Sequence, residues 1–213
     1  MAAPSAPFIL SRATTSDMHE IVSLEYDCFP EFVRQAFMGC NSKDDLSRIL
    51  EKYKQEMRDD KNDVWIKVID KESGAVVAAC NWKVYVNGTT DGGNDEEVPE
   101  WLEGEIRQKS EELTKKMNES RRRAMPGPFI HLHICFTNSD YRRRGAGGMM
   151  LKWGCDLADL LGLPGWIEAS EEGNFLYKMF GFYDYEKIEG ELGGTNMKRD
   201  ARTAAFEGGK AKG

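Results

Sequence analysis

The chain has 213 residues, of which 40% are hydrophobic and 31% charged, and its formal net charge is −7. This length and composition are typical of one globular domain and exclude a disordered chain. No apolar run approaches the roughly 20 residues of a membrane-spanning helix, and the N-terminus shows no secretory signal. The net negative charge disfavours a general nucleic-acid binder, and five cysteines without a CxxC pair disfavour disulfides and zinc. We therefore expect a cytoplasmic protein with no metal, nucleic-acid or membrane partner.

The N-terminal part of the chain alternates between strand-like and helix-like patterns. A short apolar run is followed by apolar residues at helical spacing up to Pro30, which stops the helix. Two β-branched and aromatic runs joined by a Gly-containing turn predict an antiparallel hairpin whose second arm bends or bulges. An irregular, aromatic-rich segment at 31–40 could line a pocket. The expected elements are a strand at 8–12, helices at 18–29 and 43–58, and strands at 64–70 and 75–86.

Residues 87–128 differ from the rest in composition. The segment opens with a Gly- and Asp-rich stretch, ends with RRRAMPGP, and holds a charged helix with a thin apolar stripe. We interpret it as an insertion between two core strands. Its charges indicate either an ordinary solvated helix face or a lid over a substrate site.

The C-terminal part predicts a central strand and further helix-strand units. Residues 129–137 form a nearly continuous apolar run, as expected of a central strand. A helix up to Leu161, a strand at 165–170, a short helix and a strand at 182–188 follow. Residues 190–213 are Gly-rich and charged, which predicts a flexible tail. The expected organisation is a single domain over 1–189, and its order of elements predicts a mixed α/β (α+β) fold, one mixed sheet with helices packed on it.

A basic glycine-rich turn follows the central strand directly and precedes a helix. Arg142, Gly145 and Gly147 form an R-x-x-G-x-G pattern there. Glycines let the backbone approach a ligand closely, and the free N–H groups of the helix start attract an anion. Arg143 and Arg144 add positive charge that can pair with phosphates. The turn therefore predicts a pyrophosphate site; the alternative is a plain strand-to-helix turn with surface arginines.

Two motifs in this order resemble the GNAT superfamily of acyl-CoA N-acyltransferases. The R-x-x-G-x-G turn is similar to its pyrophosphate-binding turn, and LYKMFGF near the end is similar to its L-Y-x-x-x-G-F signature. The pattern from Trp153 to Ser170 also resembles small fungal members. The resemblance implies a central mixed, mostly antiparallel sheet with helices on both faces. It also implies a splayed strand pair that holds acetyl-CoA.

The resemblance further implies which residues contact the cofactor. Main-chain groups around Cys135, Phe136 and Thr137 would bind the pantetheine arm, and Tyr177 would lie beside the thioester sulfur. Many family members carry an asparagine where this chain has Ser170, and Asn174 is out of register, so an asparagine contact is in doubt. The implied pyrophosphate cradle comprises Arg142, Arg143, Arg144, Gly145, Ala146, Gly147 and Gly148.

Four side chains are candidates for proton transfer. His131 and His133 lie two residues apart on one strand, so both should point to the same face, and imidazoles titrate near neutrality. The stretch HLHICFTNSDYRRRGAG resembles the serotonin-type arylalkylamine acetyltransferases, in which two histidines relay protons. Glu168 on the next strand is a rival base. Tyr177 is the candidate acid, because a phenol is protonated at neutral pH; the alternative for each residue is an ordinary core or paired side chain.

These features favour an N-acetyltransferase that acts on a small-molecule primary amine by general base and general acid catalysis. The acidic net charge favours a cationic acceptor, and Phe29, Phe32, Phe37, Trp82, Tyr85 and Trp101 offer aromatic surface for its pocket. A protein N-acetyltransferase for lysines or N-termini, or a non-catalytic acyl-CoA-binding module, are the alternatives. The protein is expected to be a monomer or a homodimer.

Overall fold

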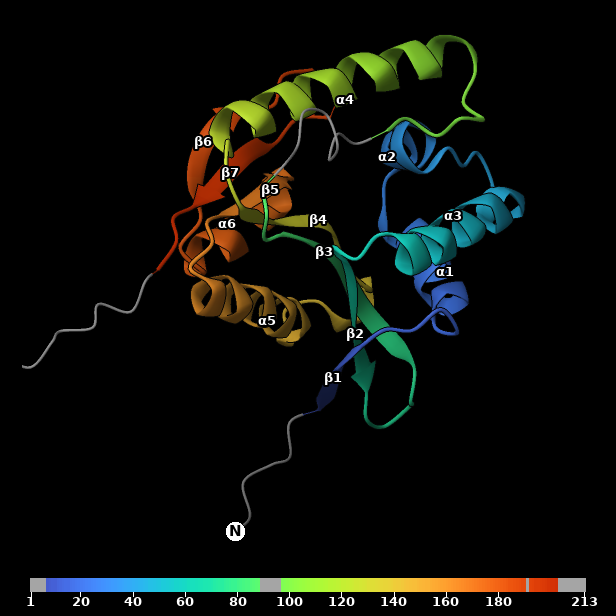
Figure 1. The fold of residues 1–213 in the computed structure, drawn as a ribbon. Helices are drawn as coiled ribbons and strands as arrows, with labels where there is room; N and C mark the ends of the chain where they lie inside the picture. Colours follow the sequence, from blue (N-terminus) through green and yellow to red (C-terminus); the bar gives the residue numbers. More distant parts are fainter. Residues whose placement is uncertain (1–6, 89–96, 191, 203–213) are drawn as a thin grey trace, which may run out of the picture.

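The computed structural model describes residues 7–88, 97–190 and 192–202 (Figure 1). A single sheet runs through its centre and helices cover both faces of that sheet. The strands are β1 Phe8–Arg12, β2 Asp63–Asp70, β3 Val76–Tyr85, β4 Phe129–Thr137, β5 Gly165–Ala169, β6 Tyr183–Lys187 and β7 Thr195–Arg199. The helices are α1 Met18–Cys28, α2 Glu31–Val33, α3 Leu46–Asp59, α4 Gly104–Ala124, α5 Ala146–Leu161 and α6 Glu171–Met179, with a π-helix η1 at Arg34–Met38 and two short 3₁₀ turns, η2 Lys43–Asp45 and η3 Ser139–Tyr141.

The strand order in the described part of the chain is β1-β2-β3-β4-β5-β7-β6. All neighbouring strands are antiparallel except β4 and β5, which run parallel. The predicted mixed, mostly antiparallel sheet is therefore confirmed. The hairpin of β2 and β3 is present, with a shift of register between Val68 and Ile69.

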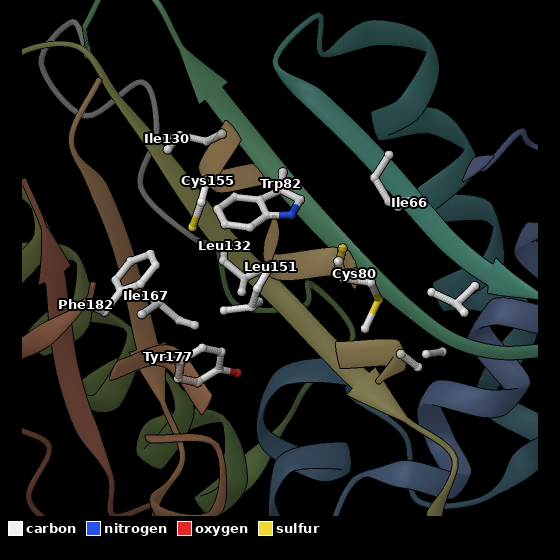
Figure 2. Close-up of a cluster of buried hydrophobic side chains, with 14 of the residues drawn as sticks. Ile66, Cys80, Trp82, Ile130, Leu132, Leu151, Cys155, Ile167, Tyr177 and Phe182 are labelled. Atoms are coloured by element: carbon white, nitrogen blue, oxygen red, sulfur yellow. The ribbon is translucent and has the colours of Figure 1, made fainter. Parts of the chain in front are cut away.

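Each face of the sheet has its own core. On one face, α5 packs against a cluster that includes Trp82, Leu132, Leu151 and Ile167 (Figure 2). On the other face, α1 and α3 cover a cluster around Trp65 and Phe136 at the β1–β4 end. The C-terminal end of α4 packs over a smaller aromatic cluster on that same face, which includes Phe129 and Trp166. Successive residues of β4 thus point alternately into these different cores.

Strand β4 contains one extra residue at a decisive place. Leu132 pairs with Trp82 and Ile134 pairs with Asn81, so His133 has no cross-strand partner of its own. Such a bulge bends the strand and increases its twist. The ladder between β4 and β5 ends at the same level, because its last pair is Leu132 with Ile167. Beyond this point the two parallel strands diverge.

Two predictions about local structure are wrong. Residues 31–38 were expected to be irregular, but they form α2 and the π-helix η1, which Gly39 ends in a left-handed conformation. The flexible tail predicted at 190–213 contains β7, which lies between β5 and β6 in the sheet. Within β7, Met197 is fully buried and Arg199 reaches Asp159 of α5 at 2.7 Å. Residues 203–213, and residues 89–96 of the predicted insertion, lie outside the described part of the chain.

The described residues contain no helix long and apolar enough to cross a membrane, and no cluster of acidic, His and Cys side chains suited to a metal ion. The five cysteines are free thiols.

Glu25 of α1 makes the stability of this fold depend on pH. Its side chain is buried, and the Tyr53 hydroxyl of α3 donates a hydrogen bond to its Oε1 at 3.1 Å. Burial raises the pKa of Glu25 from 4.5 to about 8, although the hydrogen bond from Tyr53 opposes this. Between these two pH values the folded protein keeps a proton that the unfolded chain releases. The free energy of unfolding should therefore fall as the pH rises from about 4.5 to about 8.

The variant Glu25→Gln tests this pH dependence. Glutamine keeps an acceptor for Tyr53 but does not titrate. In the variant, the free energy of unfolding measured with urea should therefore decline much less across that pH window. Glu51→Gln, on the exposed side of α3, is the matched control and should follow the wild type. Parallel stability curves for wild type and Glu25→Gln would show that Glu25 is ionised in the fold.

Candidate active site

The site is built around the gap between β4 and β5. At one end of the gap, Ile130, His131 and Leu132 pair with β5. From Ile134 to Thr137, β4 pairs with β3 only. Main-chain groups on that free edge of β4 can bind an extended ligand in the way a neighbouring strand would. Cys135 and Thr137, predicted to bind the pantetheine arm, both lie on this free stretch.

The predicted pyrophosphate turn leads from β4 to the first turn of α5. Gly145 is the residue before α5, with φ of 104°, and no side chain caps the helix start. The first N–H groups of a helix have no partner within the helix, so they can donate to an anion. A Cβ at Gly147 would come within 3.0 Å of Leu176, so this glycine also lets α6 pack closely. Ala146 is buried beneath the turn, and Gly148 lies in the first turn of α5.

Two of the three arginines in the turn have partners within the protein. Arg142 donates to the carbonyl oxygen of Thr137 at 3.2 Å and pairs with Glu172 of α6 at 2.8 Å. The Arg144 guanidinium stacks over the rings of Tyr141 and Phe8. Arg143 is exposed and has a left-handed backbone with φ of 58°. The arginines therefore stabilise the conformation of the turn and also give it positive charge.

Tyr177 of α6 lies on the α5 side of the gap. Its ring is buried in the cluster with Leu132 and Ile167, and Figure 2 shows the hydroxyl directed away from Phe182. The hydroxyl lies within interaction distance of the Cys135 thiol. Burial, reinforced by Cys135, raises the pKa of Tyr177 well above 10, so the phenol is protonated at neutral pH. Burial also raises the pKa of Cys135 to about 12, which keeps this thiol protonated.

The two histidines lie together on the opposite side of the sheet. The ring centroids of His131 and His133 are 5.6 Å apart, as their spacing on one strand predicts. His131 is fully buried, and its Nε2 lies 2.6 Å from Oε2 of Glu168 on β5. The sheet thus separates the imidazoles from Tyr177, and both groups border the gap between β4 and β5.

Glu168 is held from three sides. Besides His131, the Trp166 indole donates to its Oε1 at 2.6 Å, and Arg121 of α4 lies 3.1 Å from the same oxygen. Burial opposes ionisation of this carboxyl, but the charges and hydrogen bonds of His131, Arg121 and Trp166 outweigh burial and lower its pKa. An ionised carboxylate saturated in this way is a weak base, so the geometry favours an orienting part for Glu168 over the rival-base hypothesis.

Helix α4 covers this side of the sheet. Its buried face is polar, with Ser110, Thr114, Asn118 and Arg121 at helical spacing. Near its start, Ser110 donates to the Ala36 carbonyl of η1; near its end, Arg121 reaches Glu168. The helix therefore extends from η1 to the β5–β7–β6 end of the sheet (Figure 1). Its opposite face is solvated, as one interpretation of its charges predicted. A role as a lid over a substrate site stays a prediction.

Other residues predicted for the site lie nearby but point elsewhere. The Phe136 ring packs edge-on against Phe29 on the α1 side. Ser170 caps α6 by accepting from the Gly173 N–H, and Asn174 donates to Asp184 of β6. Trp82, expected to line a pocket, is fully buried against α5.

Sequence reasoning missed two residues that shape the site. Arg121 stood in a run of three arginines that resembled a solvated helix end. Gly173 was not singled out, but a Cβ there would lie 2.7 Å from the Tyr177 ring. Its i, i+4 spacing to Tyr177 was the available signal, since such residues are neighbours on a helix.

Comparisons with known proteins place the fold. No family model and no curated protein matches the sequence. Among solved structures, the C-terminal condensation domain of Ebony in complex with beta-alanyl-dopamine has a TM-score of 0.66 at 11% identity, covering 91% of this chain and 99% of that one. A histone acetyltransferase HPA2 and related acetyltransferase from Corynebacterium glutamicum has a TM-score of 0.61 at 15% identity, covering 93% and 99%.

A third similar structure is the PaiA N-acetyltransferase of Thermoplasma acidophilum in complex with coenzyme A. Its TM-score is 0.52 at 8% identity, covering 91% of this chain and 98% of that one. Other matching structures are described as GNAT-family acetyltransferases. With its splayed parallel pair in a mostly antiparallel sheet, this chain has the fold of the GNAT acetyltransferases.

Proposed function

We propose that the protein is an acetyl-CoA-dependent N-acetyltransferase that acetylates a primary amine of a small molecule. The observation that carries the proposal is a buried phenol and a buried imidazole on opposite sides of the gap between two diverging parallel strands. Acetyl transfer needs a base for the amine and an acid for the leaving thiolate, and this arrangement supplies both.

The residues present fit acetyl-CoA. The uncapped start of α5 offers N–H donors for the pyrophosphate, and the free edge of β4 offers main-chain groups for the pantetheine amides. Arg142, Arg143 and Arg144 are all exposed and add positive charge to the turn. When bound, acetyl-CoA would supply the activated acetyl carbonyl. A structure of similar fold contains coenzyme A, which supports this choice of cofactor.

The imidazoles are the proposed proton acceptors. A hydrogen bond from His131 Nε2–H to Glu168 leaves Nδ1 as the nitrogen with a lone pair. His133, 5.6 Å away between ring centroids, can pass the proton on. Glu168 stabilises the positive charge that the ring gains, so the base and its orienting carboxylate form one unit.

Tyr177 is the proposed acid. Its hydroxyl is protonated across the physiological range and lies next to a sulfur atom, that of Cys135. Tyr177 would donate a hydrogen bond, and then its proton, to the thiolate that acetyl-CoA releases. Cys135 does not compete as a nucleophile, because burial keeps its thiol protonated.

The cover formed by α4 supports a small acceptor over a protein. An extended peptide needs an open groove along the histidine face, whereas α4 closes that face between η1 and β5. The polar inner side of α4 suits an acceptor with hydrogen-bonding groups. The Ebony domain with beta-alanyl-dopamine supports arylalkylamines as the first class to test.

The acceptor class can be tested with competing substrates. We expect coenzyme A release from acetyl-CoA with aryl- or alkylamines, and at least tenfold less with a lysine peptide at equal concentration. The double variant His131→Ala/His133→Ala should lower amine-dependent release at least tenfold, and His19→Ala is the control outside the site. A preference for the peptide would contradict the proposal.

A further inference from the structure

Arg121 belongs to helix α4, outside the strands and turns from which the proposed chemistry is built. Its side chain is 3% exposed, and its Nη1 lies 3.1 Å from Glu168 Oε1. Asn118, three residues earlier on the same helix, accepts from the Arg121 Nη2. A guanidinium that binds its own helix on one side and the site on the other is held in a single orientation.

We propose that Arg121 is a positioning residue of the acetyl-transfer site: it holds the Glu168 carboxylate and balances its charge beside the His131 ring. The inference rests on the proposed function. It gives α4 a role in positioning the groups of the site, in addition to covering them.

The two carboxylate oxygens of Glu168 have different partners. Oε1 accepts from Trp166 and Arg121, and Oε2 faces His131 at 2.6 Å. A carboxylate this close to an imidazole, with no balancing cation, favours the imidazolium form, which cannot take a proton from an amine. Arg121 offsets that field while it fixes the carboxylate plane. Burial raises the pKa of Glu168, but His131 and Arg121 together lower it by more, so the carboxylate between them is ionised.

The surrounding charges belong mostly to other pairs. Lys83 of β3 is in register with His131, but its ammonium is 2.8 Å from Asp63 and 3.4 Å from Asp60. Glu186 of β6 pairs with Arg123 at the surface. His133 is the second titratable group beside His131. Of the cations named here, Arg121 forms an ion pair with Glu168 itself.

The test compares Arg121→Met and Arg121→Lys with the control Arg123→Met. Arg123 lies two residues along the same helix, and its side chain is 57% exposed. In Arg121→Met we expect the acidic limb of the kcat/KM profile, and the midpoint of the His131 ring titration followed by NMR, to move up by about one pH unit. Arg121→Lys should shift the acidic limb and the ring titration less, and Arg123→Met should leave them unchanged. Unchanged midpoints in Arg121→Met would overturn the inference.

A double-mutant cycle separates positioning from general support of the fold. If Arg121 acts through Glu168, adding Arg121→Met to Glu168→Gln should change kcat/KM less than twofold, whereas Arg121→Met alone should cost at least tenfold. The double variant removes both buried charges. It therefore lacks the unpaired buried charge that a single variant leaves, and it should fold even if a single variant does not. Additive losses would overturn the inference. The NMR titration needs no turnover. If the wild type does not acetylate amines, the proposed function is refuted, but the ring titration still shows whether Arg121 acts on His131 through Glu168.

Discussion

Replacing Tyr177 with phenylalanine should lower kcat for amine acetylation by about 10²- to 10⁴-fold, the usual effect of losing a general acid. The ring stays in its buried place beside Leu132, so acetyl-CoA affinity measured by calorimetry should change little. Since burial raises the pKa of Tyr177 well above 10, this residue should cause no loss of rate below pH 10 in the wild type.

The matched control is Tyr183→Phe. Tyr183 is 41% exposed and donates to Asp200, away from the gap. This variant also loses one phenolic hydroxyl and should keep wild-type kcat. A loss of less than about threefold in Tyr177→Phe would show that the leaving thiolate receives its proton from elsewhere.

The largest expected effect on stability comes from Gly154→Ala in α5. A Cβ at Gly154 would lie 2.1 Å from the ring of Trp82, which is fully buried in the core on that face. The clash is with a rigid ring inside a packed core, so the added methyl group should cost about 3 kcal/mol. That exceeds the gain of about 1 kcal/mol from alanine's helix propensity. The melting temperature should fall by several degrees.

Gly148→Ala is the control on the same helix. Its added Cβ would meet only the Phe180 ring, at 4.0 Å, an ordinary contact. It should therefore be neutral or slightly stabilising in thermal unfolding. An equal loss of stability in both variants would mean that helix α5 tolerates no alanine for reasons unrelated to Trp82.

The fold could be predicted where apolar periodicity is strong. The run Phe129–Thr137 indicated the central strand, and the spacing of Met150, Leu157 and Leu161 indicated α5; both are confirmed. β7 was missed because Thr195–Arg199 has one large apolar residue, Met197, and buries an arginine instead. Its burial depends on Asp159, a partner 40 residues away, and no local pattern reveals such a partner.

The site could be predicted where chemistry and spacing coincide. The i, i+2 spacing of His131 and His133 predicted adjacent rings, which the structure shows. Their roles, and those of the residues proposed to bind the cofactor, stay predictions. The link from Arg121 to Glu168 could not be predicted, because it depends on how α4 lies across the sheet. That placement follows from tertiary packing, which the charge pattern of α4 alone does not specify.

The most direct test of the account is a mass-spectrometric assay of acetyl transfer. Purified protein would be mixed with acetyl-CoA and a pool of aryl-, alkyl- and sugar amines plus a lysine peptide. The account predicts an N-acetylated small amine formed together with coenzyme A, at a rate that Tyr177→Phe lowers by at least about 10²-fold. Acetyl-CoA that binds but stays intact with every acceptor, or acetylation of the peptide alone, would contradict it.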